Sequence, residues 1–310
     1  MSNIKSKLKR LIGWIPDESG FKRKMRVHQG WWRTCVLGEV EGEHPIEENR
    51  TVCSTIKNGR DTYKNFLTPT VSQIVKNTLQ KRKQRDESGI IEEDRLFDNL
   101  LSSQPVCFNF FGELSADPSF AFSVLHQFYH ELTEVTDVLF EFAPEKNYTQ
   151  DNSAFDVAIK VKSGNSIGLL GVECKYTDAF SSTEYDKLAY KEIFQRSTQF
   201  KEPYSKYISS QFNQLFRNQL IAEALVQNGE YTFVKTALFC HQEDQKTLQI
   251  GSEFQKMLHD GKEIFRIITY QSLIENIQKL DLPWVKRELS MLLWARYCAT
   301  QLSEEIYKKD

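Results

Sequence analysis

Two acidic residues and one lysine, Asp156, Glu173 and Lys175, are the residues of this chain best suited to carry out chemistry. They fall within SAFDVAIKVKSGNSIGLLGVECKY, residues 153–176, near the ends of two apolar segments. Burying a carboxylate and an ammonium is costly unless the charges are paired, or ligate a metal, or both. The stretch therefore predicts a charged site at one end of a pair of strands.

The patterning of residues 153–176 predicts how these side chains are positioned. Four apolar residues alternate with small or charged ones, as expected for a strand: Phe155, Val157, Ile159 and Val161. Ser163-Gly164-Asn165 supplies a turn. In the second strand a period of two places Gly171, Glu173 and Lys175 on one face. The expected hairpin brings Asp156 close to Glu173.

Two carboxylates on neighbouring strands make an oxygen-rich site that suits Mg²⁺, which prefers carboxylates, waters and phosphate oxygens. The backbone carbonyl of Cys174 is a candidate further ligand. Lys175, its pKa lowered by the cation, would orient or deprotonate an attacking water, or stabilise the transition state. This is the chemistry of phosphodiester hydrolysis. The alternative is a Glu173–Lys175 pair with only a structural role.

The elements around the hairpin predict an α/β core between residues 118 and 240, in the order helix, strand, strand, strand, helix, strand. Asp117-Pro118 begins a helix that runs to about residue 132, and residues 138–143 and 232–240 read as strands. Further helices are expected over residues 70–85, 86–104, 183–196, 208–227, 271–280 and 283–302, with a strand at 263–270 and a short aromatic piece after Pro105.

The spacing of Asp156, Glu173 and Lys175 resembles the D…(D/E)-x-K motif of the PD-(D/E)XK nuclease superfamily. The segments FEFAP, SAFDV, GVECKYTD and QLFRNQL are similar to a branch of bacterial restriction-endonuclease-like proteins. The resemblance covers about residues 105–240 and leaves most of the N-terminal third outside. Phe155 stands where the motif usually has Pro.

The resemblance implies roles for further residues. The superfamily usually adds a Glu, for which Glu141 is favoured over three others: Glu113, Glu131 and Glu134. A structural carboxylate is the alternative reading of Glu141. Gln214, Arg217 and Asn218 stand out on the helix after the hairpin, where the resemblance implies contact with substrate phosphate or with the lysine. Gln214 and Arg217 are the favoured substrate-binding residues, and the planar fork of Arg217 suits phosphate. A solvated polar helix face would explain them equally.

These features predict a restriction-endonuclease-like α/β domain at residues 105–310, with a mixed sheet flanked by helices and with C-terminal helices. Residues 1–104 would form a mostly helical, basic extension. The expected function is that of a bacterial nuclease using Mg²⁺ or Mn²⁺, acting on DNA and able to dimerise. The alternative is an inactive nuclease fold that binds nucleic acid or protein.

Composition bears on the partners, the cellular location and the metal-binding capacity of the protein. A net charge of −2 excludes a uniformly basic coat, but basic runs at 5–10, 22–26 and 76–85 offer local phosphate attraction or simply solvated surface. No apolar run reaches the roughly 20 residues of a membrane span, and no signal peptide is evident, so a cytoplasmic protein is expected. The six dispersed cysteines favour packed thiols over a zinc site. His126 and His130 lack the Glu of H-E-x-x-H, which favours an ordinary histidine pair over a metal site.

Overall fold

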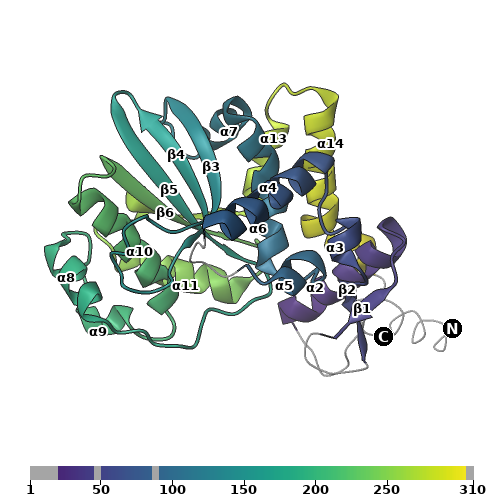
Figure 1. Cartoon of the computed structure of the whole chain (residues 1–310), viewed down its shortest axis with the longest axis horizontal. Coiled ribbons are helices and arrows are strands. Elements are labelled where there is room, and N and C mark those ends of the chain that lie inside the picture. The colour runs from purple at the N-terminus through teal and green to yellow at the C-terminus, as the bar shows by residue number, and fades with distance from the viewer. Residues whose placement is uncertain (1–19, 45–49, 86–90, 305–310) are drawn as a thin grey trace.

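A five-stranded mixed sheet forms the centre of the molecule in a computed structural model that describes residues 20–44, 50–85 and 91–304 (Figure 1). The strand order is β3-β4-β5-β6-β7. β3, β4 and β5 pair antiparallel, whereas β5, β6 and β7 pair parallel. The strands are β3 (Glu134–Phe142), β4 (Phe155–Ser163), β5 (Ser166–Lys175), β6 (Phe233–Cys240) and β7 (Phe265–Thr269). The predicted α/β class with a central mixed sheet is confirmed.

The expected hairpin is β4 and β5, joined by the turn at Gly164, whose φ of +57° suits glycine. β5 lies in the middle of the sheet, and its last eight residues are all buried. A strand covered on both faces reads as a nearly continuous apolar run. The two charges at its end are therefore placed inside the protein.

Helices cover both faces of the sheet (Figure 1). The main hydrophobic core lies between one face and α6 (Ser103–Ala116), α7 (Pro118–Leu125), α13 (Tyr270–Gln278) and α14 (Trp284–Leu293). The opposite face is covered by α8 (Leu188–Arg196), α10 (Asn213–Gln227) and α11 (Gln245–Lys256). Two single-turn helices, α9 (Tyr204–Tyr207) and α12 (Gly261–Ile264), complete this side. No helix in the described ranges is long and apolar enough to cross a membrane.

Two predicted elements near residue 110 differ from the structure. The aromatic piece after Pro105 is the helix α6, whose N-terminus is capped by the Ser102 side chain. α7 ends at Leu125, earlier than predicted, so His126 and His130 follow it. His126 Nδ1 lies 3.1 Å from a backbone carbonyl oxygen and His130 is exposed, as expected of an ordinary pair.

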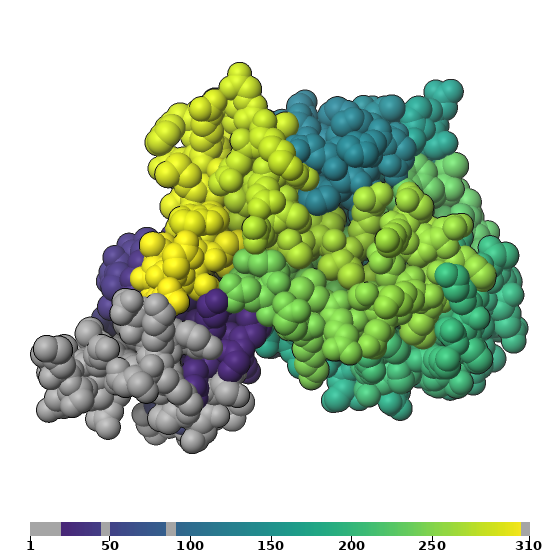
Figure 2. Space-filling view, turned by 180° about the vertical axis from the view of Figure 1, so that it is seen from behind, coloured from purple at the N-terminus to yellow at the C-terminus, as the bar shows by residue number. Residues whose placement is uncertain are grey.

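The N-terminal third mixes helices with a small sheet. It contains α2 (Gly20–Trp31), η1 (Trp32–Val36), β1 (Glu41–Glu43), β2 (Thr51–Ile56), α3 (Gly59–Thr62), α4 (Pro69–Arg85) and α5 (Glu93–Phe97). The helix expected over 86–104 is only α5 and the start of α6, with residues 86–90 outside the described part. The chain ends in η2 (Trp294–Cys298) and η3 (Thr300–Ser303). These lie against the N-terminal segment (Figure 2). One contact between them is that of His28 Nδ1 with Ser303 Oγ, at 3.0 Å.

Buried polar contacts tie the N-terminal third to the sheet. Gln29 on α2 donates a hydrogen bond to the Tyr176 hydroxyl (2.9 Å), directly after β5. The guanidinium of Arg296, fully buried, donates to the backbone oxygen of Asn65 (2.7 Å). The Tyr270 hydroxyl donates to the backbone oxygen of Lys175 (2.7 Å). The end of β5 is therefore held by two separate parts of the chain, α2 and α13, and Arg296 links the C-terminal segment to the N-terminal third.

Candidate active site

Asp156 and Glu173 are brought together at one end of the β4–β5 hairpin. Val157 pairs with Val172, so the next residues outward are Asp156 and Glu173. Asp156 Oδ2 accepts a hydrogen bond from the backbone N–H of Cys174 at 2.6 Å. Because N–H and C=O of one strand residue point to the same edge, the Cys174 carbonyl also faces β4. The three predicted metal-binding groups therefore lie within one small region.

The expected alternation of β4 breaks at Asp156. Val157 packs into the main core, whereas Phe155 packs on the opposite face with Ala158 and Leu169. The Phe155 ring fills the space above Gly171, where an added Cβ would lie 2.4 Å from a ring carbon. Phe155 and Val157 therefore lie on opposite faces of the sheet, and the carboxylate of Asp156 between them turns toward the β5 backbone.

Glu173 and Lys175 form a buried ion pair whose polar atoms are held by α10. Lys175 Nζ lies 3.0 Å from Glu173 Oε1, and the Lys175 and Glu173 side chains are only 7% and 5% exposed. The Gln214 amide donates to Glu173 Oε1 (2.5 Å) and accepts from Lys175 (2.9 Å). Asn218 donates to Glu173 Oε2 (2.7 Å). The Lys175 ammonium also lies 5.0 Å from the centre of the Phe180 ring.

The structure thus places Gln214 in contact with the two charged groups of the motif and Asn218 in contact with Glu173. Asn218 follows Gln214 by four residues, so both project from one face of α10.

Glu141 lies opposite Asp156 on the neighbouring strand. Its flanking residues Phe140 and Phe142 pair with Val157 and Phe155. The backbone φ of Glu141 is +50°, in the left-handed region, which is uncommon for a residue inside a strand. Such strain costs of order 1–3 kcal/mol and concentrates at functional sites. The backbone at Glu141 is therefore bent where a third carboxylate joins the site.

The other acids considered for this role have partners elsewhere. Glu131 forms an ion pair with Lys235, and Glu134 pairs with Lys162 at 2.8 Å. Glu113 accepts a hydrogen bond from the Thr68 hydroxyl at 2.6 Å. Glu141, in contrast, interacts electrostatically with Glu173 and Asp156.

Crowding of buried carboxylates dominates the electrostatics of the site. Burial, and then the negative charges of Glu173 and Glu141, hold the pKa of Asp156 well above its usual range. Burial, partly offset by Arg82, raises the pKa of Glu141 to about 7. For Lys175, burial lowers the pKa, but Glu173 and Asp156 outweigh it and the net pKa is raised.

Asp156, Glu141 and the buried Glu173 form a set of oxygen donors whose negative charge exceeds the single positive charge of Lys175 beside them, and this fits a divalent cation. Glu173 already accepts bonds on both carboxylate oxygens. Oε1 accepts from both Lys175 and Gln214, whereas Oε2 accepts only from Asn218, so a lone pair of Oε2 could bind a cation.

Cys107 on α6 contacts the same region from the main core. Its thiol, the Cys174 thiol and an Asp156 oxygen lie within 4.8 Å of one another. Burial raises the pKa of the Cys174 thiol to about 11 and that of Cys107 well above its usual value. Cys107 donates to the Ser103 backbone oxygen (3.2 Å). Both thiols stay protonated at neutral pH, as expected for packed cysteines.

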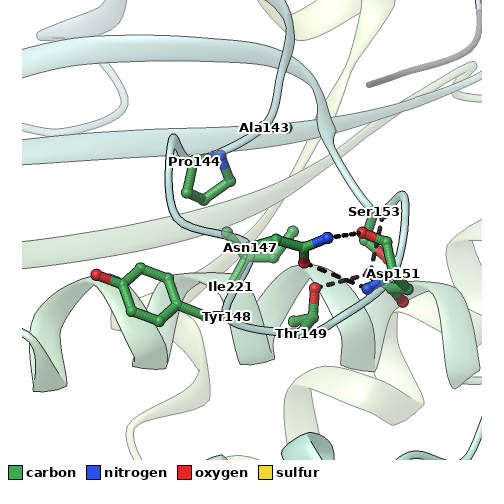
Figure 3. A pocket seen from close by; sticks show the side chains of 8 residues that line it. All are labelled: Ala143, Pro144, Asn147, Tyr148, Thr149, Asp151, Ser153 and Ile221. Atoms are coloured by element: carbon green, nitrogen blue, oxygen red, sulfur yellow. Dashed lines mark hydrogen bonds between the residues drawn. The ribbon is translucent and has the colours of Figure 1, made fainter. Parts of the chain in front are cut away.

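Arg217 is on the same helix as Gln214 and Asn218 but contacts the β3–β4 loop. Its guanidinium donates to Ser153 Oγ (2.8 Å), lies 3.7 Å from Asp151, and stacks 4.6 Å from the Tyr185 ring centre. Figure 3 shows the surface pocket formed by this loop, in which Thr149 and Ser153 point toward Asp151. Arg217 thus has protein partners, and phosphate binding by this residue stays a prediction.

Comparison with known proteins decides the family. The family model of the PD-(D/E)XK nuclease superfamily matches residues 16–299. The chain belongs to the PD-(D/E)XK nuclease superfamily. The match includes most of the N-terminal third, so the range of 105–240 expected from the motifs was too narrow. No curated protein and no solved structure matches the chain.

Proposed function

We propose that this protein is a nuclease that hydrolyses phosphodiester bonds of DNA with Mg²⁺ or Mn²⁺. The observation that carries the proposal is that Asp156, Glu173 and Glu141 lie on neighbouring strands at one end of the β4–β5 hairpin. Glu173 forms a buried ion pair there with Lys175. Clustered charges of this kind lower the stability of the fold, so a role in stability does not explain them. Membership of the nuclease superfamily supports a catalytic role instead.

In this proposal Asp156, Glu173 and the Cys174 carbonyl hold the cation. A bound divalent cation supplies a water of lowered pKa and stabilises charge on the phosphate. Lys175 orients the attacking water and donates hydrogen bonds to a phosphate oxygen, and Gln214 fixes the position of the Lys175 ammonium. Glu141, opposite Asp156, adds a carboxylate that would bind either the attacking water or the cation.

Cleavage of plasmid, linear and single-stranded DNA and of RNA, with Mg²⁺, Mn²⁺ or EDTA, tests the proposal. We expect metal-dependent cleavage of DNA that falls at least about a hundredfold in Asp156→Asn and Lys175→Met, as when a group acting in the transition state is removed. Glu134→Gln is a matched control, because Glu134 is an exposed carboxylate on the same strand as Glu141. Cleavage that survives Lys175→Met unchanged would refute the assigned role.

The second candidate is a nuclease fold that binds nucleic acid without turnover. The bonds that Lys175, Gln214 and Asn218 make to Glu173 favour it, because they pair and hold this buried carboxylate without a cation. Calorimetry that detects no Mn²⁺ binding, together with salt-sensitive DNA binding, would establish this alternative.

The proposal includes a homodimer and a bacterial, cytoplasmic setting, as expected from the sequence. Two copies would place one site on each strand of a duplex. Light scattering after gel filtration measures the oligomeric state, with and without a DNA duplex.

A further inference from the structure

Two arginines of the N-terminal helices are directed at the side of the candidate active site formed by β3 and the end of β5. The first, Arg82, is on α4. Val75, Leu79 and Arg82 share one face of this helix by their spacing. Val75 and Leu79 pack in a satellite core that also contacts Phe140, the residue before Glu141. The face of α4 that bears Arg82 is therefore directed at the β3 end of the site.

Burial distinguishes Arg82 from the lysines around it. Arg82 is partly buried, whereas three lysines of the same helix are exposed: Lys76, Lys81 and Lys83. The positive charge of Arg82 lies close enough to Glu141 to lower its pKa, an effect opposed by burial. Within the basic run at 76–85, Arg82 thus faces the carboxylates, whereas Lys76, Lys81 and Lys83 are exposed to solvent.

The second arginine is Arg95 on α5. Its guanidinium lies 2.9 Å from Asp178 Oδ1 and 3.5 Å from Glu92 Oε1. Asp178 follows Lys175 by three residues and also accepts a hydrogen bond from the backbone N–H of Ser103 (2.8 Å). Arg95 therefore approaches the site from the end of β5, and its charge also acts on Glu141.

Carboxylates repel a DNA strand, and positive charge from a bound cation and from nearby side chains offsets that repulsion. Lys175 is already bonded to Glu173 and Gln214 on the α10 side. The basic run at 22–26 is directed elsewhere, because Lys24 pairs with Glu243 and Arg26 donates to Ser54 on β2. Arg82 and Arg95 differ by position: the face of α4 that bears Arg82 packs toward β3, and Arg95 is held at the end of β5 by Asp178.

We propose that Arg82 and Arg95 bind backbone phosphates of the DNA strand that enters the site, so that α4 and α5 form one wall of the substrate-binding site. The planar guanidinium matches phosphate oxygens with two parallel hydrogen bonds. Such interactions position the strand without reading its sequence. The inference rests on the proposed function, since it assigns the groups that bind substrate at the same site.

Fluorescence anisotropy with a short fluorescein-labelled DNA duplex in EDTA tests the inference without cleavage. Arg82→Gln and Arg95→Gln are compared with Lys81→Gln, which removes the same charge from an exposed position on α4. We expect each arginine variant to bind about tenfold more weakly. The slope of log K against log salt should become shallower by about 0.9 for each phosphate that the variant no longer neutralises. Lys81→Gln should leave both quantities unchanged.

Arg82→Lys and Arg95→Lys keep the charge and should restore most of the salt slope, which separates phosphate binding from a structural role. Thermal melting of every variant checks that it is folded. Arginine variants that are folded and bind DNA like Lys81→Gln would overturn the inference, whether or not the wild type cleaves DNA. Weaker DNA binding in the arginine variants alone supports the inference, even if the wild type does not cleave DNA. The absence of cleavage would refute only the proposed nuclease activity.

Discussion

Replacing Lys175 with methionine removes the ammonium bonded to the buried Glu173 carboxylate while retaining most of the volume of the side chain. Glu173 is 5% exposed, so little water can solvate it when Lys175 is absent. Removing one partner of a buried ion pair costs roughly 3–5 kcal/mol. The amides of Gln214 and Asn218 remain and offset part of this cost. We therefore expect Lys175→Met to lower the free energy of unfolding by about 3 kcal/mol at neutral pH.

A double-mutant cycle isolates the charge pair from packing. In Glu173→Gln/Lys175→Met no charge of the pair is left buried, so the free energy of unfolding of the double variant should fall by only about 1 kcal/mol. Urea unfolding in EDTA measures both values as a shift in midpoint at constant slope. If Lys175→Met cost less than about 1 kcal/mol, or if the two substitutions were simply additive, the interpretation of Glu173 and Lys175 as a coupled buried pair would be wrong.

Two further predictions concern stability. Burial lowers the pKa of His28 and of His241 to about 4 from 6.5. The unfolded chain therefore binds more protons than the folded protein between pH 6.5 and 4, and the free energy of unfolding should fall by about 3 kcal/mol per histidine as the pH is lowered through this window. Urea midpoints measured in steps from neutral pH downward test this prediction. A flat profile would contradict it. Gly171→Ala should lower the free energy of unfolding by about 1–3 kcal/mol, because the added Cβ would lie 2.4 Å from the buried Phe155 ring. Gly164→Ala is the control, since its Cβ meets no atom and only backbone strain is expected there. An unchanged melting temperature of Gly171→Ala would refute the prediction.

The sequence was most informative where the signal was local. The β4–β5 hairpin followed from alternation and a Gly164 turn, and the charges of Glu173 and Lys175 stood out on an apolar strand. The helix α6 was missed because Phe108, Phe110 and Phe111 bury it on several sides, which leaves no amphipathic period to detect.

Features that depend on tertiary contacts could not be predicted. The change of face at Phe155 depends on the space above Gly171, and the bent backbone of Glu141 has no signature in a single sequence. Likewise, nothing in the run 76–85 distinguishes Arg82 from its neighbours until α4 packs against α6 and β3.

A crystal of the protein soaked in Mn²⁺ shows whether the three groups at the end of the β4–β5 hairpin hold a cation. We predict one anomalous peak bonded to oxygens of Asp156 and Glu173 and to the carbonyl oxygen of Cys174. A structure in which Glu173 keeps all its present partners and no ion binds at Asp156 would contradict the proposed metal site.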